Sequence, residues 1–142
     1  MRKTIAGAAA LAVFAMAPPA GAATSTTYTG EIAGDAKATV ELEIEARGDR
    51  RFVTEFIVRR FPLECEDGTV ARLQRARLAG RARVTGKGRF ELVAANADQR
   101  LGIRGRLRGG TAGGTLRYSG MTEFADQTLD CEADGLHWTA SR

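Results

Sequence analysis

The chain has few of the side chains from which enzymes usually build a catalytic centre. His137 is the only histidine, and Cys65 and Cys131 are the only cysteines in 142 residues. Ser119 and Ser141 lie in no recognisable nucleophile motif, so a serine–histidine–acid triad is not expected. The sequence therefore predicts no enzymatic activity and no catalytic residue.

Long hydrophobic runs are also missing beyond the start of the chain. Two basic residues open the sequence, and an Ala-rich apolar run over residues 5–17 follows, too short to span a bilayer as a stable helix. Two prolines end this run, and residues 20–22 are small, as signal peptidase requires. We expect a signal peptide over residues 1–22, one domain over residues 23–142, and no transmembrane segment in the mature chain.

Export would place the domain in an oxidising compartment: secreted, periplasmic or at the cell envelope. Two cysteines in so small an exported chain usually pair, so we expect a disulfide between Cys65 and Cys131. Closing a loop of roughly 65 residues contributes about 4 kcal/mol in the chain-entropy model. With both thiols bonded, a single histidine cannot assemble a usual zinc site.

Acidic residues are scarce in the middle of the chain. Residues 72–108 hold 11 basic side chains and two acidic ones, Glu91 and Asp98, for a net charge of +9. Removal of the two basic residues of the signal peptide leaves 19 basic against 17 acidic residues, so the mature domain carries only +2. The total charge is weak evidence for an acidic partner, but its distribution is strongly segmented.

Apolar and polar side chains alternate along several segments, which is the pattern of a half-buried β-strand. Strands are expected over residues 38–46, 51–59, 75–85, 101–108 and 136–140. Glycine-rich turns separate them, including one expected over residues 109–114. This pattern predicts an all-β domain, an antiparallel β-sandwich of about eight strands. A flattened up-and-down β-barrel is the alternative.

Two stretches near the C-terminus carry a family resemblance. They are residues 109–120 (GGTAGGTLRYSG) and residues 131–142 (CEADGLHWTASR), and Cys65 follows an apolar strand. In this layout the chain resembles uncharacterised secreted all-β domains of bacteria, with a cysteine pair, a Gly-Thr-Leu-Arg strand and a terminal Trp-Thr-Ala. The resemblance implies an all-β fold and an exported location, and it transfers no functional residue.

Acidic residues flank both cysteines in a pseudo-repeat. A disulfide would gather six carboxylates near one point, and calcium binds six to eight oxygen ligands of this kind. An EF-hand is excluded because its twelfth position falls on Ser141. The alternative is a solvated acidic rim paired with arginines. The candidate calcium ligands are Glu64, Glu66, Asp67, Asp130, Glu132 and Asp134.

Arginines alternate along two of the expected strands. A row of guanidinium groups on a sheet can bind phosphate or carboxylate polymers, such as an anionic envelope glycan, or a lipid surface. The alternative is a solvated face paired across strands with glutamates 41, 43 and 45. The candidate polyanion-binding residues are Arg75, Arg77, Arg81, Arg83, Arg104, Arg106 and Arg108.

These features predict an exported, non-catalytic β-domain that acts as a binding or structural module at the cell surface or outside the cell. An anionic envelope polymer or a surface protein would be its partner. Nucleic acid is not expected, because no aromatic residues interleave with the arginines. The alternative function is a carrier that holds a small molecule or lipid in a barrel-type pocket. Calcium is the one cofactor that the sequence suggests.

Overall fold

The computed structural model describes residues 22–142, so the expected signal peptide lies, apart from residue 22, outside the described residues. Within that range the regular structure consists of eight antiparallel strands, and no helix there is long and apolar enough to cross a membrane. The expected all-β class is confirmed. The strands are β1 (Thr24–Ile32), β2 (Asp35–Arg47), β3 (Arg50–Cys65), β4 (Val70–Arg83), β5 (Arg89–Ala95), β6 (Gln99–Arg108), β7 (Thr111–Phe124) and β8 (Gln127–Ser141).

Most strands pair with the strand that follows them in the chain, and two further pairings join the ends of this meander. The sheet order is β4-β3-β2-β1-β8-β7-β6-β5, because β1 also pairs with β8. In addition, β3 pairs with β8 through Glu64 opposite Glu132 and Cys65 opposite Cys131. Strands β1, β2, β3 and β8 therefore form a small closed barrel, and the other four strands are bonded outside this ring.

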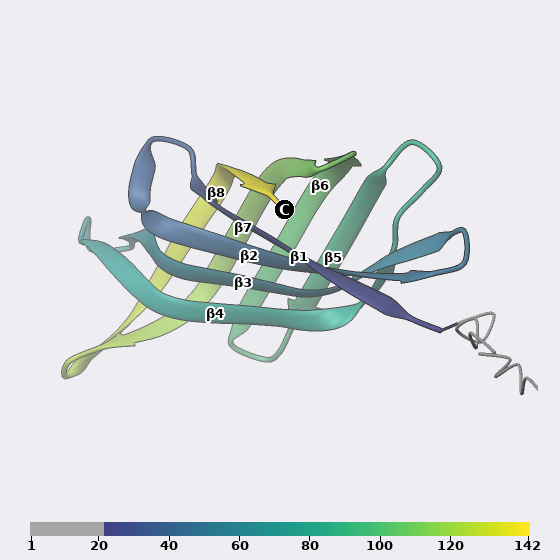
Figure 1. Ribbon diagram of the computed structural model, residues 1–142. Coiled ribbons are helices and arrows are strands. Elements are labelled where there is room, and N and C mark those ends of the chain that lie inside the picture. The colour runs from purple at the N-terminus through teal and green to yellow at the C-terminus, as the bar shows by residue number, and fades with distance from the viewer. Residues whose placement is uncertain (1–21) are drawn as a thin grey trace, which may run out of the picture.

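The strands lie in two layers that cross each other (Figure 1). Strands β2, β3 and β4 run side by side in front, and β5 to β8 run diagonally behind them. Each layer has an inner face toward the core and an outer face toward solvent.

The apolar positions of the alternating pattern form one core between the layers. Trp138 is its largest fully buried side chain, and its ring centroid lies 5.2 Å from that of Phe56 and 6.2 Å from that of Phe90. Gly105 makes room for this cluster, since a Cβ there would lie 2.6 Å from Phe90 Cζ and 2.9 Å from Trp138 Cζ2. The expected disulfide between the two cysteines is present.

The glycine-rich stretch over residues 109–114 differs from the turn that the sequence predicts. Only Gly109 and Gly110 form the turn, and β7 begins at Thr111. Gly114 lies within β7, and a glycine is needed there because β6 passes very close to it. A Cβ at Gly114 would lie 1.8 Å from the carbonyl oxygen of Arg104. The glycines of this stretch therefore serve strand packing as well as chain reversal.

Candidate functional site

The seven arginines that the sequence singles out lie on two different strands. Four are on β4, which pairs with β3 in the front layer, and three are on β6, which pairs with β5 and β7 in the rear layer. The interpretation of these residues as one row is therefore wrong. Each set faces solvent from its own layer, and the two sets have to be considered separately.

Two of the four candidate arginines of β4 are occupied by contacts within the protein, whereas Arg75 and Arg83 have no carboxylate partner at ion-pair distance within residues 22–142. Arg77 Nε donates to Glu55 Oε2 at 2.6 Å. Arg81 pairs with Glu45 at 3.3 Å, and its guanidinium carbon lies 3.9 Å from the centre of the Phe52 ring. Both carboxylates are mostly shielded from water. The Arg81–Glu45 pair matches the structural alternative, in which arginines pair across strands with glutamates 41, 43 and 45, whereas Glu55 of β3 was not among the expected partners.

The outer face of β5 to β8 carries a different arrangement, which is built around a glycine. Gly102 of β6 lies opposite Val93 of β5 on one side and opposite Arg117 of β7 on the other. Arg100 and Arg104 stand two residues before and after it on the same face. The strand register thus brings three guanidinium groups around a position that has no side chain.

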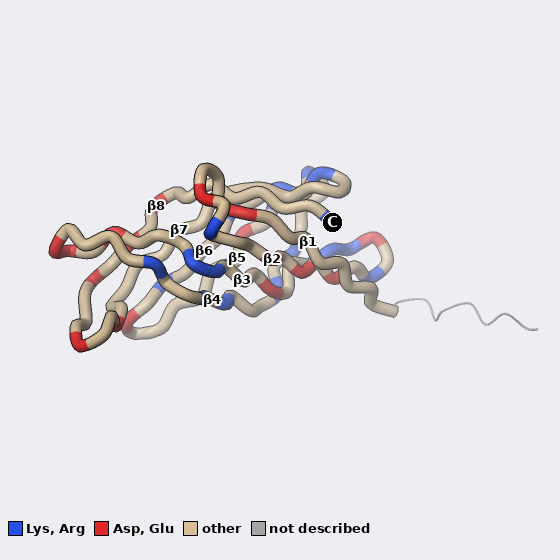
Figure 2. The backbone as a smooth tube through the Cα atoms, turned by 60° about the vertical axis from the view of Figure 1, so that its left-hand side comes forward, with Lys and Arg blue, Asp and Glu red and all other residues tan. Residues whose placement is uncertain are grey.

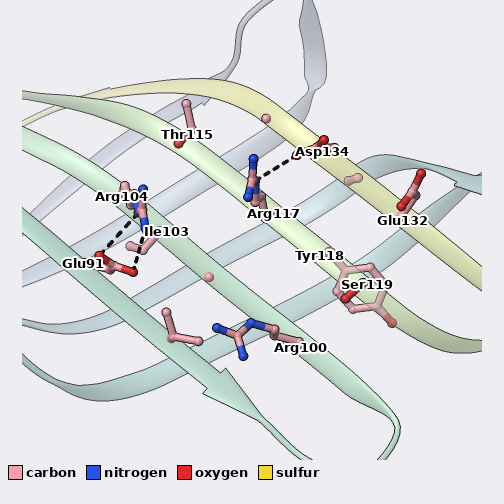
Figure 3. Close-up of a pocket in the computed structure, with 14 residues that line it drawn as sticks. Glu91, Arg100, Ile103, Arg104, Thr115, Arg117, Tyr118, Ser119, Glu132 and Asp134 are labelled. Carbon is pink, nitrogen blue, oxygen red and sulfur yellow. Dashed lines mark hydrogen bonds and ion pairs between the residues drawn. The ribbon is translucent and has the colours of Figure 1, made fainter.

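These residues line a hollow of about 500 Å³ on the outer face, which we call the arginine groove. Figure 3 shows Arg100, Arg104 and Arg117 around its floor. Arg104 pairs with Glu91 at 3.4 Å and Arg117 with Asp134 at 2.8 Å. All four side chains of these pairs are more than half exposed, so the pairs are weak and open to exchange.

A second hollow, of about 710 Å³, continues the first toward the other end of the same face. Arg104 lines the first hollow and Arg106 the second, and these two residues are neighbours on the outer face of β6. On β7, Thr115 lines the first hollow and Gly113 the second, and these two residues are likewise neighbours on the outer face. The two hollows are therefore adjacent along β6 and β7.

Charges of both signs lie on this part of the molecule: β5 to β8 carry six basic and five acidic side chains, and Glu91, Glu132 and Asp134 line the first hollow together with its three arginines. Arg89 and Arg106 lie directly opposite each other on β5 and β6, an arrangement that costs stability because like charges repel. Acidic residues lie both on the strands and in hairpin turns such as that of residues 66–69, and Figure 2 marks them in red. An anion bound on the outer face of β5 to β8 would relieve the repulsion between these arginines.

The acidic residues beside the disulfide do not come together as a metal site. Glu66 Oε1 accepts a hydrogen bond from the backbone N–H of Asp130 at 3.3 Å, and Asp134 pairs with Arg117 of the groove. Hydrogen bonds from the hydroxyl and backbone N–H of Thr69 lower the pKa of Asp67. Within residues 22–142 no group of three or more His, Cys, Asp or Glu is placed to hold a metal ion.

Comparison with protein-family models, with curated proteins and with solved structures finds no match to this chain. Of the features that the resemblance to secreted bacterial β-domains implies, only the all-β fold and the disulfide are therefore supported. Function has to be argued from the site alone.

Two groove residues, Arg100 and Arg117, were not among the candidates from the sequence. Arg117 is a single arginine between Leu116 and Tyr118, and Arg100 follows the turn before β6. Alternation places each on an outer face, but only the register of β6 against β7 brings both to Gly102. The sequence signal that could have pointed to Arg100 is the charged, outward alternation of β6 extended toward its start, whereas Arg117 on β7 had no such signal beyond its outward position.

Proposed function

We propose that the protein is an exported, non-catalytic binding module that holds an anionic polymer on the outer face of β5 to β8. One observation carries this proposal: Arg100, Arg104 and Arg117 surround Gly102 in a hollow open to solvent. Guanidinium groups bind carboxylate, sulfate and phosphate oxygens through paired N–H donors. Three of them around one depression form a site for such a group.

The contrast between the two arginine sets supports the choice of face. Arg77 and Arg81 of β4 have shielded carboxylate partners, so a ligand would have to break those pairs at a cost. Within the described chain, Arg100 has no carboxylate partner at ion-pair distance, and those of Arg104 and Arg117 are solvated. The groove arginines therefore exchange their contacts for those of a ligand at little cost.

Retention on a heparin-type resin tests the proposal. The wild-type domain should bind at low salt and elute as the salt concentration rises. The double variant Arg100→Glu with Arg117→Glu should elute at much lower salt, because the groove then holds one arginine and five carboxylates in place of three of each.

The matched control is Arg75→Glu with Arg83→Glu, which makes the same change in net charge on β4. This control should elute close to the wild type. Equal losses in both variants would indicate attraction by net charge alone, and wild-type protein that washes through at low salt would overturn the proposal.

One observation favours the carrier as a second candidate. The indole N–H of Trp138 is buried between the layers and has no hydrogen-bond partner within the described residues. A buried donor without a partner is costly, and a ligand that carries an oxygen acceptor would satisfy it. Such a ligand would have to displace part of the core, since Phe56 and Phe90 pack against this ring.

Fluorescence tests the carrier directly, because Trp138 is the only tryptophan of the chain. Titration with a fatty acid should shift or quench the tryptophan emission at micromolar concentration if the core admits a ligand. An unchanged spectrum up to the solubility limit of the fatty acid would remove this candidate.

A further inference from the structure

Hydroxyl side chains share the outer face with the arginines, and their placement indicates the class of polymer. They stand on β7 and β8 beside the row of arginines on β6, and the one aromatic residue that lines either hollow, Tyr118, is only 4% exposed. The hydroxyl residues of the two hollows include Thr111, Thr115, Ser119, Thr139 and Ser141.

We infer that the ligand is an acidic polysaccharide that lies along β6 and β7 and spans both hollows, an inference that rests on the proposed function. An acidic polysaccharide presents carboxylate or sulfate groups together with many hydroxyls. The arginines bind the charged groups, and the threonine and serine hydroxyls both donate to and accept from the sugar hydroxyls.

The length of the surface favours a linear chain over a single small anion. From Arg100 to Arg108 the outer face of β6 extends over nine residues, and the eight steps between them span about 27 Å at the rise of a strand. Along the floor, Gly102 lies in the first hollow and Gly113 in the second. Because neither position has a side chain, an extended polymer can approach the backbone over this distance.

The composition of the face disfavours nucleic acid as the polymer. The aromatic residues Phe90, Tyr118 and Trp138 of these strands point into the core, where each is at most 5% exposed, and Phe124 at the end of β7 is partly buried against the same core. Single-stranded nucleic acids bind through bases that stack on exposed aromatic rings, and this surface offers none within residues 89–141.

The test compares two polymers of matched charge, a polyuronate and inorganic polyphosphate, at near-physiological salt. The variant Thr115→Val with Thr139→Val removes two hydroxyls and no charge. We expect its affinity for polyuronate to fall by about fivefold for each hydroxyl, with no change for polyphosphate. Thr39→Val on β2, in the other layer, is the control and should match the wild type for both polymers.

The outcomes separate this inference from the proposed function. If Arg100→Glu with Arg117→Glu weakens both polymers but the threonine variant weakens neither, the anionic-polymer function stands and the polysaccharide inference fails. If the arginine variant binds both polymers as the wild type does, the proposed function itself fails. A loss for polyuronate alone in the threonine variant, with folding confirmed by an unchanged melting temperature, supports the inference.

Discussion

Cys65 lies directly opposite Cys131 in the two-residue pairing that joins β3 to β8. This pairing closes the ring of β1, β2, β3 and β8, and it places Glu64 directly opposite Glu132. Like charges in that position repel, so the hydrogen bonds at this closure work against an electrostatic cost. The disulfide offsets this repulsion, because it links β3 covalently to β8 where the ring closes.

Removal of the disulfide should therefore destabilise the fold strongly. The bridge joins residues 66 positions apart, for which the chain-entropy model gives about 4 kcal/mol. We expect Cys65→Ser with Cys131→Ser to lower the unfolding free energy by about this amount, measured by urea denaturation. Wild-type protein in excess reductant is the matched control and should behave like the variant. Equal urea midpoints for oxidised wild type and variant would contradict this account.

Gly114 should be among the least replaceable residues of the chain. A Cβ at this position would lie 1.8 Å from the carbonyl oxygen of Arg104 and 2.6 Å from the Cα of Gly105, so β6 and β7 would have to separate. We expect Gly114→Ala to cost about 3 kcal/mol or more.

Gly86 provides the control for this substitution. A Cβ at Gly86 meets nothing within 4 Å, so Gly86→Ala should change stability by no more than about 0.5 kcal/mol. Expression yield and melting temperature are measured for both variants. Matching values for the two would show that β6 and β7 are not as close as described.

Stability at acidic pH should depend on Asp35. Arg72 Nη1 donates to Asp35 Oδ2 at 2.8 Å and to the carbonyl oxygen of Arg60 at 2.7 Å, which links β2, β3 and β4. The hydrogen bond from Arg72 lowers the pKa of Asp35 below its ordinary value of 3.8. Since the folded pKa is the lower one, the stabilisation is present above pH 3.8 and disappears as the pH falls through the folded value.

The variant Asp35→Asn keeps the size of the side chain and removes its charge. Its urea midpoint should lie below that of the wild type at pH 7 and pH 5 by a constant difference, and the two midpoints should converge as the pH falls through the lowered pKa of Asp35. A difference that is largest in strong acid would contradict the assigned direction of the pKa shift.

Calcium should not change the melting temperature. The carboxylates beside the disulfide are engaged separately: Asp67 with the turn at Thr69, Glu66 with the backbone of Asp130, and Asp134 with Arg117. We expect superimposable melts in millimolar calcium and in excess chelator. A rise of several degrees with calcium, absent with magnesium, would restore the calcium hypothesis for this cluster.

The fold follows from the sequence wherever one face of a strand is apolar and the other is charged. Val40, Leu42 and Ile44 are buried and the glutamates between them are not, as the alternation predicts. Strand β1 was not predicted, because its sequence TSTTYTGEI is mostly polar and only Tyr28 and Ile32 are buried. Its place between β2 and β8 depends on pairing with neighbours, which periodicity does not specify.

The candidate site depends on register, and so only part of it could be predicted. The outward arginines of β6 follow from alternation with Leu101, Ile103 and Leu107. Their separation from the arginines of β4 depends on which strands share a layer, and the convergence of Arg100 and Arg117 on Gly102 depends on how β6 aligns with β7. A one-residue slip would move Gly102 to the core face.

Gly102 offers a way to block the arginine groove without changing its charge. A Cβ at this position would lie 3.4 Å from Val93 Cγ2, an ordinary contact, so a larger side chain fits the backbone and rises from the floor of the groove. We expect Gly102→Leu to fold with an equal or higher melting temperature, because glycine weakens the interior of a strand. It should nevertheless bind polyuronate at least tenfold more weakly.

The control for this blocked groove is Ala79→Leu, which adds a similar side chain at an exposed position of β4. It should bind polyuronate as the wild type does. If Gly102→Leu retains full affinity, the polymer is attracted by the arginines but does not enter the hollow, and contact with the floor has no part in recognition. If affinity is lost while the melting temperature is kept, the shape of the groove contributes to binding independently of its charge.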